Sequence, residues 1–332
     1  MPAIEISDLT KEFRVPEKNP GLWNAAKSLL RRRFRAIPAV TGLNFSIQEG
    51  ELVGFLGANG AGKTTTLKML SGLLHPSSGT ANVLGYTPWQ RRTAFQKQFS
   101  LVMGHRTQLW WELPAQETFR LNQEIYEIPD AQYRATVEEL VELLELRDCM
   151  SIPVKKLSLG QRMKAELAVS ILHRPKLLLL DEPTLGLDVV MQKKIRQFIL
   201  EYNRRYRATI LLTSHNMDDV VELCPRVILI DHGRLLYDGS LRQVVERYAP
   251  HKVIRADFNE AVSPVELARI GRIAQYQGTR AVLEVPRGEV SPRAADLLTH
   301  FPVADLTIEE TPIQEVVRRL FTQAPSKAAP RG

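Results

Sequence analysis

One short stretch limits what this chain can fold into more than any other: residues 57–65, with the sequence GANGAGKTT. The apolar residues 52–56 before it are typical of a buried strand, and residues 65–70 after it are typical of a helix. A strand and a helix joined by the pattern G-x-x-x-x-G-K-[ST] form a phosphate-binding loop. The sequence therefore predicts that this loop binds the phosphates of a nucleotide.

The residue types of this loop suit an anionic ligand. Glycines lack the Cβ atoms that would keep backbone N–H groups away from an anion, and they permit positive φ where the loop curls. The N-terminus of the following helix favours negative charge, and the ammonium of Lys63 is expected to reach the β- and γ-phosphates. The hydroxyl of Thr64 is a candidate ligand of Mg²⁺. We expect nucleotide contacts from Gly57, Asn59, Gly60, Gly62, Lys63, Thr64 and Thr65.

Composition excludes several other classes of protein. The 332 residues are enough for about two domains, and 44% hydrophobic with 24% charged residues is usual for a globular chain. No apolar run approaches the roughly 18 residues of a membrane-spanning helix, and the first residues lack the pattern of a secretory signal. Cys149 and Cys224 stand apart from each other and from the histidines, so neither a disulfide nor a zinc site is predicted. We expect a cytosolic protein with reduced thiols.

A basic segment concentrates the net charge of +7. Residues 15–38 begin with loop-forming prolines and then carry apolar residues at helical spacing, from Leu22 to Phe34, with Arg31, Arg32 and Arg33 between them. This pattern predicts an amphipathic basic helix. Two interpretations stay open: a surface helix packed on its own domain, and a helix that contacts a membrane or a membrane-protein partner.

Strand and helix patterns alternate along the next part of the chain. The unbroken apolar residues 177–180 predict a strand buried on both faces, which delivers Asp181 and Glu182 at its carboxyl end. Residues 209–213 predict another strand, with His215 at the corner after it. Helices are predicted at residues 116–125, 131–146 and 158–173, the last with Ser158 as its N-cap. This alternation predicts an α/β fold with the nucleotide at the carboxyl edge of the sheet.

The composition changes near residue 249. Short strand and helix patterns follow to about residue 322, which predicts a small C-terminal α/β domain over residues 249–322. Residues 323–332, rich in proline and alanine, are predicted to form a disordered tail. No internal repeat is present, so we expect a single nucleotide-binding unit.

Together and in this order, the motifs resemble those of the ATP-binding-cassette (ABC) ATPases, the nucleotide-binding subunits of transporters. The resemblance covers residues 4–248: Walker A at 57–65, the signature LSLGQ at 157–161, Walker B at 177–181 with Glu182, then GLD at 186–188 and His215. It implies an α/β P-loop NTPase cassette over residues 1–248, with a RecA-like core, an antiparallel β subdomain and a helical subdomain at about 105–173.

The resemblance also implies a role for each motif. Asp181 corresponds to the Walker B aspartate that positions Mg²⁺, together with the Thr64 hydroxyl. Glu182 corresponds to the general base that polarises the attacking water, and its alternative is a solvated carboxylate. His215 corresponds to the switch histidine that contacts the γ-phosphate, and its alternative is a structural histidine. The expected cofactors are ATP and Mg²⁺.

The signature implies a second cassette. Ser158 and Gly160 lie at a predicted helix N-terminus, which is another anion site, whereas the Walker A loop of one chain already surrounds its own phosphates. In the resembled family two cassettes pair head to tail, and each signature closes over the ATP of the other. We therefore expect Ser158, Gly160, Gln161 and Asp188 to serve a partner's nucleotide, in a homodimer or in a heterodimer with another ABC ATPase.

Three positions carry less specific signals. Phe13 lies where the family places the aromatic residue that stacks on adenine, and its alternative is a core phenylalanine. His105 stands at the position of the family's loop glutamine, within residues 104–114, which in the family sense nucleotide and touch the membrane subunit. Gln108 lies nearby, and the roles of His105 and Gln108 stay open.

Within the family, the C-terminal domain and residues 64–70 resemble the single-cassette ATP-binding proteins of ABC-2-type exporters. This implies integral membrane permeases as partners, peripheral contact with the cytoplasmic face of the membrane, and no nucleic acid. One alternative is a soluble ABC ATPase that acts on ribosomes or nucleic acid, to which the basic composition points; such relatives usually carry two cassettes or a long coiled-coil insertion. Another is a catalytically inactive regulatory or scaffold subunit, against which Lys63, Glu182 and His215 argue.

Overall fold

The computed structural model describes residues 2–16, 34–104, 107–248, 250–311 and 315–316 of the chain. The chain divides into two compact units, Met1–Gly239 and Ser240–Gly332, each with a hydrophobic core of its own. In the described ranges, every helix is too short or too polar to cross a lipid bilayer. Most of the expected basic helix falls on residues 17–33, and the expected tail falls on residues 323–332, so both lie outside the described residues.

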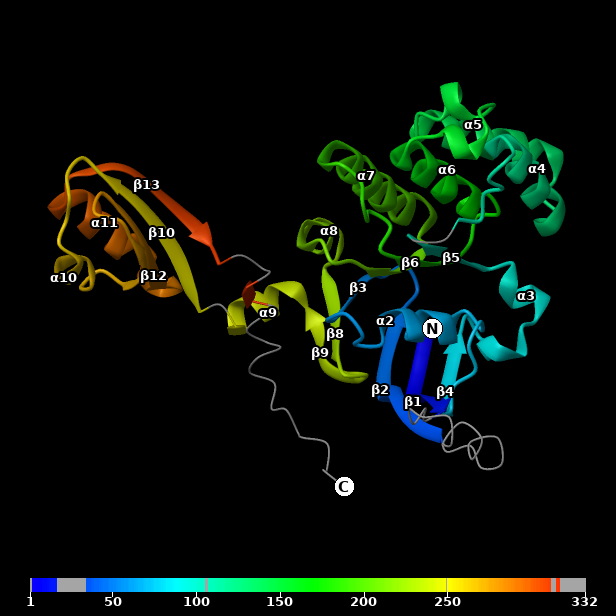
Figure 1. Ribbon diagram of the computed structural model, residues 1–332, viewed down its shortest axis with the longest axis horizontal. Helices are drawn as coiled ribbons and strands as arrows, with labels where there is room; N and C mark the ends of the chain where they lie inside the picture. The colour runs from blue at the N-terminus through cyan, green and yellow to red at the C-terminus, as the bar shows by residue number, and fades with distance from the viewer. Residues whose placement is uncertain (1, 17–33, 105–106, 249, 312–314, 317–332) are drawn as a thin grey trace, which may run out of the picture. The chain divides into compact units, whose positions relative to one another are not determined.

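The larger unit contains a six-stranded sheet with the strand order β5-β6-β7-β3-β8-β9 (Figure 1). Its strands are β3 (Leu52–Leu56), β5 (Phe99–Met103), β6 (Leu177–Asp181), β7 (Thr209–Thr213), β8 (Arg226–Asp231) and β9 (Arg234–Ser240). The pairings from β5 to β8 are all parallel, so the carboxyl ends of these strands lie along one edge. Every residue of β3, β6 and β7 is buried, which explains their almost continuously apolar sequences.

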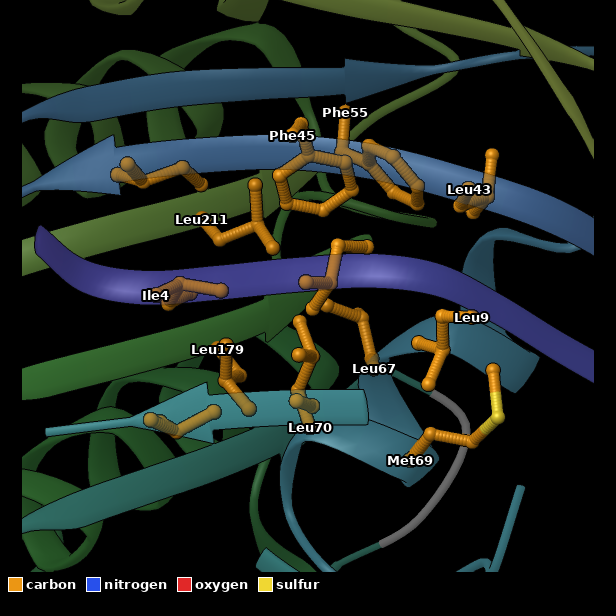
Figure 2. Close-up of a cluster of buried hydrophobic side chains, with 14 of the residues drawn as sticks. Ile4, Leu9, Leu43, Phe45, Phe55, Leu67, Met69, Leu70, Leu179 and Leu211 are labelled. Carbon is orange, nitrogen blue, oxygen red and sulfur yellow. The ribbon is translucent and has the colours of Figure 1, made fainter. Parts of the chain in front are cut away.

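A three-stranded antiparallel sheet with the order β2-β1-β4 packs against helix α2 (Lys63–Leu70). Its strands are β1 (Pro2–Pro16), β2 (Phe34–Gln48) and β4 (Ser78–Val83). One hydrophobic cluster joins both sheets through α2: Ile4 and Phe45 come from the antiparallel sheet, Leu67 from α2, and Phe55 and Leu211 from the parallel sheet (Figure 2). The ring centroids of Phe45 and Phe55 are 5.8 Å apart. Because α2 packs between the two sheets, the loop that leads into it is held in place.

Three helices gather beside β5 and β6 (Figure 1): α4 (Ala115–Tyr126), α5 (Asp130–Leu143) and α6 (Leu159–Ile171). The other helices of this unit are α3 (Thr93–Gln96), α7 (Val189–Tyr206) and α8 (Met217–Leu223). Short 3₁₀ turns add η1 (Pro88–Gln90), η2 (Arg147–Cys149) and η3 (Val154–Lys156). The helices α6, α7 and α8 each begin next to a residue of the site described below.

Strand β2 begins earlier than the sequence pattern predicts. The apolar spacing predicts a helix that includes Phe34, but residues 34–38 are strand and continue the ladder with β1. In that ladder Phe13 pairs with Ile37, and Pro16 pairs with Phe34. Pairing between residues far apart in the sequence decides their conformation, and helical periodicity does not register such pairing. The helix prediction is therefore wrong at Phe34, the last of its apolar positions.

The smaller unit is an antiparallel sheet with the order β11-β12-β10-β13 and helices packed on one face. Its strands are β10 (His251–Phe258), β11 (Arg272–Tyr276), β12 (Arg280–Pro286) and β13 (Val303–Glu310). Its helices are α9 (Leu241–Tyr248), α10 (Pro264–Leu267), η4 (Arg287–Glu289) and α11 (Val290–His300). Alternate residues of β10, such as Ile254 and Ala256, enter the core, whereas Arg255 between them is exposed and pairs with Glu309 at 2.8 Å. This alternation is what a sheet with one covered face requires.

Candidate active site

The phosphate-binding loop, residues 57–62, connects β3 to α2 and is fixed by close backbone contacts. A Cβ on Gly57 would lie 2.5 Å from the carbonyl oxygen of Ile230. Gly62 caps α2 with φ +107°, and a Cβ there would lie 2.5 Å from the carbonyl oxygen of Ala39. Since Gly62 has no side chain to cap α2, the N–H groups of the first turn are left for a ligand. The other predicted contacts of this stretch are exposed or half-buried: Asn59, Gly60, Thr64 and Thr65.

The side chain of Lys63 folds over this loop. Its Nζ donates hydrogen bonds to the carbonyl oxygens of Gly57 at 2.7 Å and Ala58 at 3.1 Å. Burial lowers the pKa of Lys63, and the negative charges of Glu182 and Asp181 partly oppose that shift. A phosphate group bound on the loop would add negative charge and favour the ammonium form further.

Two hydroxyls orient the carboxylate of Asp181 at the end of β6. Thr64 Oγ1 donates to Asp181 Oδ2 at 2.8 Å, and Thr213 Oγ1 donates to Asp181 Oδ1 at 2.6 Å. Carboxylate and hydroxyl oxygens are the hard ligands that Mg²⁺ prefers. Within the described ranges, no cluster of three or more His, Cys, Asp or Glu residues forms a metal cage. One carboxylate beside a phosphate-binding loop matches how Mg²⁺ is held when nucleotide phosphates supply further ligands.

Glu182 and His215 form a pair beside this carboxylate. His215 Nε2 lies 2.8 Å from Glu182 Oε1. Glu182 directly follows β6, and His215 comes shortly after the neighbouring strand β7. Their side chains are 23% and 42% exposed, so water can reach both. A carboxylate that is oriented by an imidazole at this edge can accept a proton from a water molecule.

The backbone at Glu182 is held in an unusual conformation. Its φ is +56°, a region that residues other than glycine rarely adopt. Its N–H is shared between the carbonyl oxygen of Thr213 at 3.0 Å and Thr213 Oγ1 at 3.1 Å. Gly104, just after β5, donates its N–H to the Asp181 carbonyl oxygen at 2.8 Å, and a Cβ on it would lie 2.5 Å from the Glu182 carbonyl oxygen. A strained backbone conformation that several surrounding contacts hold in place is common at functional sites.

The signature residues form a separate group at the start of α6. Ser158 caps the helix in a capping box, in which Gln161 N–H donates to Ser158 Oγ at 3.2 Å and Ser158 N–H donates to Gln161 Oε1 at 3.0 Å. Asp188 caps α7, and its Oδ1 accepts from the N–H of Met191 at 2.9 Å. A Cβ on Gly160 would lie 3.0 Å from the Met191 side chain. The structure therefore brings the signature and Asp188 together, whereas α2 lies apart from α6 (Figure 1).

Three predicted positions remain. Phe13 lies on β1 and is 40% exposed, with Lys11 Nζ 5.5 Å from its ring centroid, so it is not a core residue. The Gln108 side chain donates to the Leu101 carbonyl oxygen at 3.3 Å, and its backbone N–H donates to Glu166 Oε1 at 2.8 Å. These bonds tie Gln108 to β5 and α6. His105 lies outside the described residues.

Sequence reasoning missed several residues that support the site. Thr213, the second hydroxyl on Asp181, was noted only as the end of a strand. Glu166 on α6 is buried and accepts from Thr107 Oγ1 at 2.7 Å, and burial raises its pKa although these hydrogen bonds oppose the shift. Asp219 on α8 is fully buried. For Glu166 and Asp219, the sequence shows only a charged residue on an otherwise apolar helical face. Such a residue indicates a buried partner but does not identify that partner.

Comparisons with known proteins agree with this geometry. Residues 40–185 match a family model described as "ABC transporter", and residues 250–309 match one described as "EvrA-like ABC transporter, C-terminal domain". The chain is 35% identical over 219 residues to the ABC transporter ATP-binding protein NatA of Bacillus subtilis, an alignment that covers 65% of this chain and 89% of the relative. The chain belongs to the ATP-binding proteins of ABC transporters.

Another relative of this ABC protein is named for antibiotic resistance. The chain is 31% identical to the linearmycin resistance ATP-binding protein LnrL of Bacillus subtilis, over 75% of this chain and 81% of the relative. Among solved structures, an ATP-binding subunit of an ABC transporter matches with a TM-score of 0.61 at 24% identity, over 74% of this chain and 93% of that one. A cassette solved as a dimer bound to ADP and Pi matches with a TM-score of 0.60 at 22% identity, over 72% and 99%. The predicted P-loop cassette fold is confirmed, and the protein is an ATP-binding, ATP-hydrolysing subunit of an ABC transporter.

Proposed function

We propose that this ABC ATPase powers an ABC-2-type exporter, with Glu182 as the general base and His215 as its orienting partner. The observation that carries this proposal is the 2.8 Å contact between Glu182 and His215, beside the hydrogen-bonded pair of Thr64 and Asp181. The names of the relatives support the exporter class, because they include linearmycin resistance and bacitracin transport. The decisive measurement is phosphate release from ATP by the purified chain with and without the Glu182 carboxylate.

Each group of residues in the site has a distinct role in this proposal. The loop amides and Lys63 bind the phosphates, while Thr64 and Asp181 hold Mg²⁺. Mg²⁺, when bound, neutralises charge on the β- and γ-phosphates. Glu182 accepts the proton of the attacking water. The exposed ring of Phe13 offers a surface on which adenine stacks.

A second cassette completes the site in this proposal. Ser158 and Gly160 lie at the capped N-terminus of α6, which is apart from helix α2 that follows the chain's own phosphate loop (Figure 1). Exposed apolar side chains flank it, with Leu159 at 39%, Leu185 at 51% and Val189 at 75% exposed. An exposed apolar patch rimmed by polar residues is typical of a protein interface. Two copies, or this chain and a related ATPase, would each close the signature over the partner's ATP.

The membrane subunit is proposed to dock on the loop 107–114 and helix α4. The Trp110 side chain is 56% exposed, while the backbone N–H of Trp110 donates to Thr118 Oγ1 on α4 at 3.3 Å. Leu121 and Ile125, four residues apart on α4, are also exposed and share a helix face. A pocket of about 290 Å³ adjoins Ile125, and it is lined by residues from α3 and β5, by Gln108 of the loop, and by Ile125 and Tyr126 of α4. A cytoplasmic helix of a permease, with an apolar face, fits such a groove.

Polar substitutions in this docking surface should weaken the complex without impairing the cassette. We expect Trp110→Ser and Ile125→Ser each to reduce co-purification with the membrane subunits by about tenfold or more, since buried aromatic and aliphatic anchors contribute about 2 kcal/mol or more to an interface. Hydrolysis by the isolated chain should stay near the wild-type rate. Leu73→Ser is the matched control, because Leu73 is 55% exposed and lies outside this surface. If all three variants co-purify equally well with the membrane subunits, the proposed docking surface is wrong.

The basic segment is proposed to contact the anionic surface of the membrane. Clusters of arginine next to apolar residues bind anionic lipid, at about 1 kcal/mol per basic residue. Replacing Arg31, Arg32 and Arg33 with glutamate should therefore reduce sedimentation with phosphatidylserine vesicles by more than tenfold, while ATP hydrolysis stays near the wild-type rate. The same triple replacement at Arg134, Arg147 and Lys155, which are exposed elsewhere, controls for net charge. Unchanged sedimentation of the first variant would refute this contact.

A further inference from the structure

A buried carboxylate lies behind the Glu182–His215 pair. Asp219 in α8 has 0% exposure, and each of its oxygens accepts a hydrogen bond from a buried group. Oδ2 accepts from Thr184 Oγ1 at 2.5 Å and from Ser214 Oγ at 2.6 Å. Oδ1 accepts from Arg196 Nη1 at 2.9 Å. One carboxylate thus connects three separate elements: the loop after β6, helix α7 and the end of β7.

Two of these segments carry the catalytic pair. Thr184 comes two residues after Glu182, and Ser214 directly precedes His215. The hydroxyls of Thr184 and Ser214 meet on the same oxygen of Asp219, so their separation is set by that atom. The side chains of Glu182 and His215 are 2.8 Å apart on the same two segments. The Asp219 oxygen therefore connects the two segments on the buried side, in addition to the hydrogen bonds that Thr213 makes with Asp181 and Glu182.

Arg196 explains why this residue is an aspartate. An ionised carboxylate offers acceptors only, so both hydroxyls must donate to it and their orientations are fixed. The Arg196 guanidinium, itself buried, bonds Asp219 and also Glu222 Oε2 at 2.8 Å. The buried carboxylate and the buried guanidinium are thus paired with each other, as buried charges usually are. An asparagine in its place would present an amide donor either to Arg196 or to the two hydroxyls.

We propose that Asp219 is a positioning residue for ATP hydrolysis, which holds the segments of Glu182 and His215 at their working separation through Thr184 and Ser214. The inference rests on the proposed roles of Glu182 and His215. Asp219 contacts neither side chain, and it acts only through the two hydroxyls. Removing one hydroxyl should therefore slow the chemical step and leave ATP binding intact, because the phosphate loop is not part of this network.

The test removes the hydroxyl of Thr184 without changing its shape. In Thr184→Val we expect kcat for ATP hydrolysis to fall about tenfold, with KM for ATP within about twofold of wild type. Thr184→Ser restores the hydroxyl and should restore kcat. Ser214→Ala should also lower kcat, although it additionally removes an acceptor for the Asn216 N–H at 3.0 Å. Thr209→Val is the matched control, since Thr209 is buried at the opposite end of β7 and accepts a hydrogen bond from the Gly50 N–H at 3.0 Å.

The outcomes separate this inference from the proposed function. Wild-type kcat in Thr184→Val, the same loss of kcat in Thr209→Val, or no recovery in Thr184→Ser would each overturn the role of Asp219. Glu182→Gln is measured beside them. If Glu182→Gln is inactive and Thr184→Val is unimpaired, only the inference about Asp219 fails. If Glu182→Gln hydrolyses ATP at the wild-type rate, the proposed general base fails and the positioning role fails with it.

Discussion

Replacing Glu182 with glutamine should lower kcat for ATP hydrolysis by at least about a hundredfold, because a positioned general base contributes about 10²–10⁴ to the rate. Glutamine keeps the size of the side chain and its hydrogen bonding, but it cannot accept the proton of water. ATP binding should be preserved, since the loop, Lys63 and the Thr64–Asp181 pair are untouched. ATP should therefore accumulate in a closed dimer. Phosphate release and size-exclusion chromatography with ATP and Mg²⁺ measure the two effects.

The control for this variant is Glu201→Gln, an exposed carboxylate on α7. It should hydrolyse ATP at the wild-type rate and elute as wild type does. Wild-type turnover by Glu182→Gln would exclude Glu182 as the base. An inactive variant that stays monomeric with ATP would leave the base in place but contradict closure by a second cassette.

Replacing Arg196 with methionine should destabilise the larger unit by about 3–5 kcal/mol, the usual cost of leaving a buried charge without its partner. Asp219 would keep two hydroxyl donors but lose its only bonded cation among the described residues. Methionine retains most of the packing volume, so the loss reports mainly on the charge. All four tryptophans of the chain precede residue 112, so fluorescence during urea unfolding follows this unit. The midpoint should shift strongly to lower urea, with an unchanged slope.

The matched control is Lys97→Met, which removes the cation of an ion pair at the surface, where the Lys97 side chain is 33% and the Glu127 side chain 79% exposed. Lys97 Nζ lies 2.7 Å from Glu127 Oε2, and this distance is as short as the 2.9 Å between Arg196 and Asp219. Exposed ion pairs contribute little, because water and salt screen both charges. Lys97→Met should therefore unfold close to the wild-type midpoint. A similar loss of unfolding free energy in Arg196→Met and Lys97→Met would show that the burial of Asp219 does not determine how much stability is lost.

Local patterns predicted the phosphate loop and the Asp181–Glu182 strand end because each is contained in a short stretch. Glycine at 57 and 62 is required by backbone contacts that the motif already encodes. The unbroken leucines of β6 predicted a central strand, and a central parallel strand places its next residues at the ligand edge. Helices α4, α5 and α6 followed from periodicity and from the cap at Ser158.

Features that depend on distant pairing were not predictable in the same way. Phe34 fits a helical apolar spacing, yet its pairing with Pro16 of β1 makes it part of a strand. The partners of Asp219 lie on three segments, and no spacing in one sequence shows which side chains converge in the core. The backbone N–H of Gln108 is held by the buried Glu166 of helix α6. Tertiary contacts, rather than local propensity, decided all three cases.

The start of the loop 107–114 is joined both to the segment that carries Asp181 and Glu182 and to helix α6, which begins at the signature. Gly104, shortly before the loop, contacts the peptides of Asp181 and Glu182, and Glu166 of α6 holds Thr107 and Gln108. Binding of a permease to this loop would therefore be coupled energetically to the Asp181–Glu182 segment and to the signature at the start of α6. Such coupling is reciprocal. If ATP raises the affinity of the cassette for the permease by some factor, the permease must raise the affinity of the cassette for ATP by the same factor. The detached cassette should then bind ATP more weakly than the assembled transporter does.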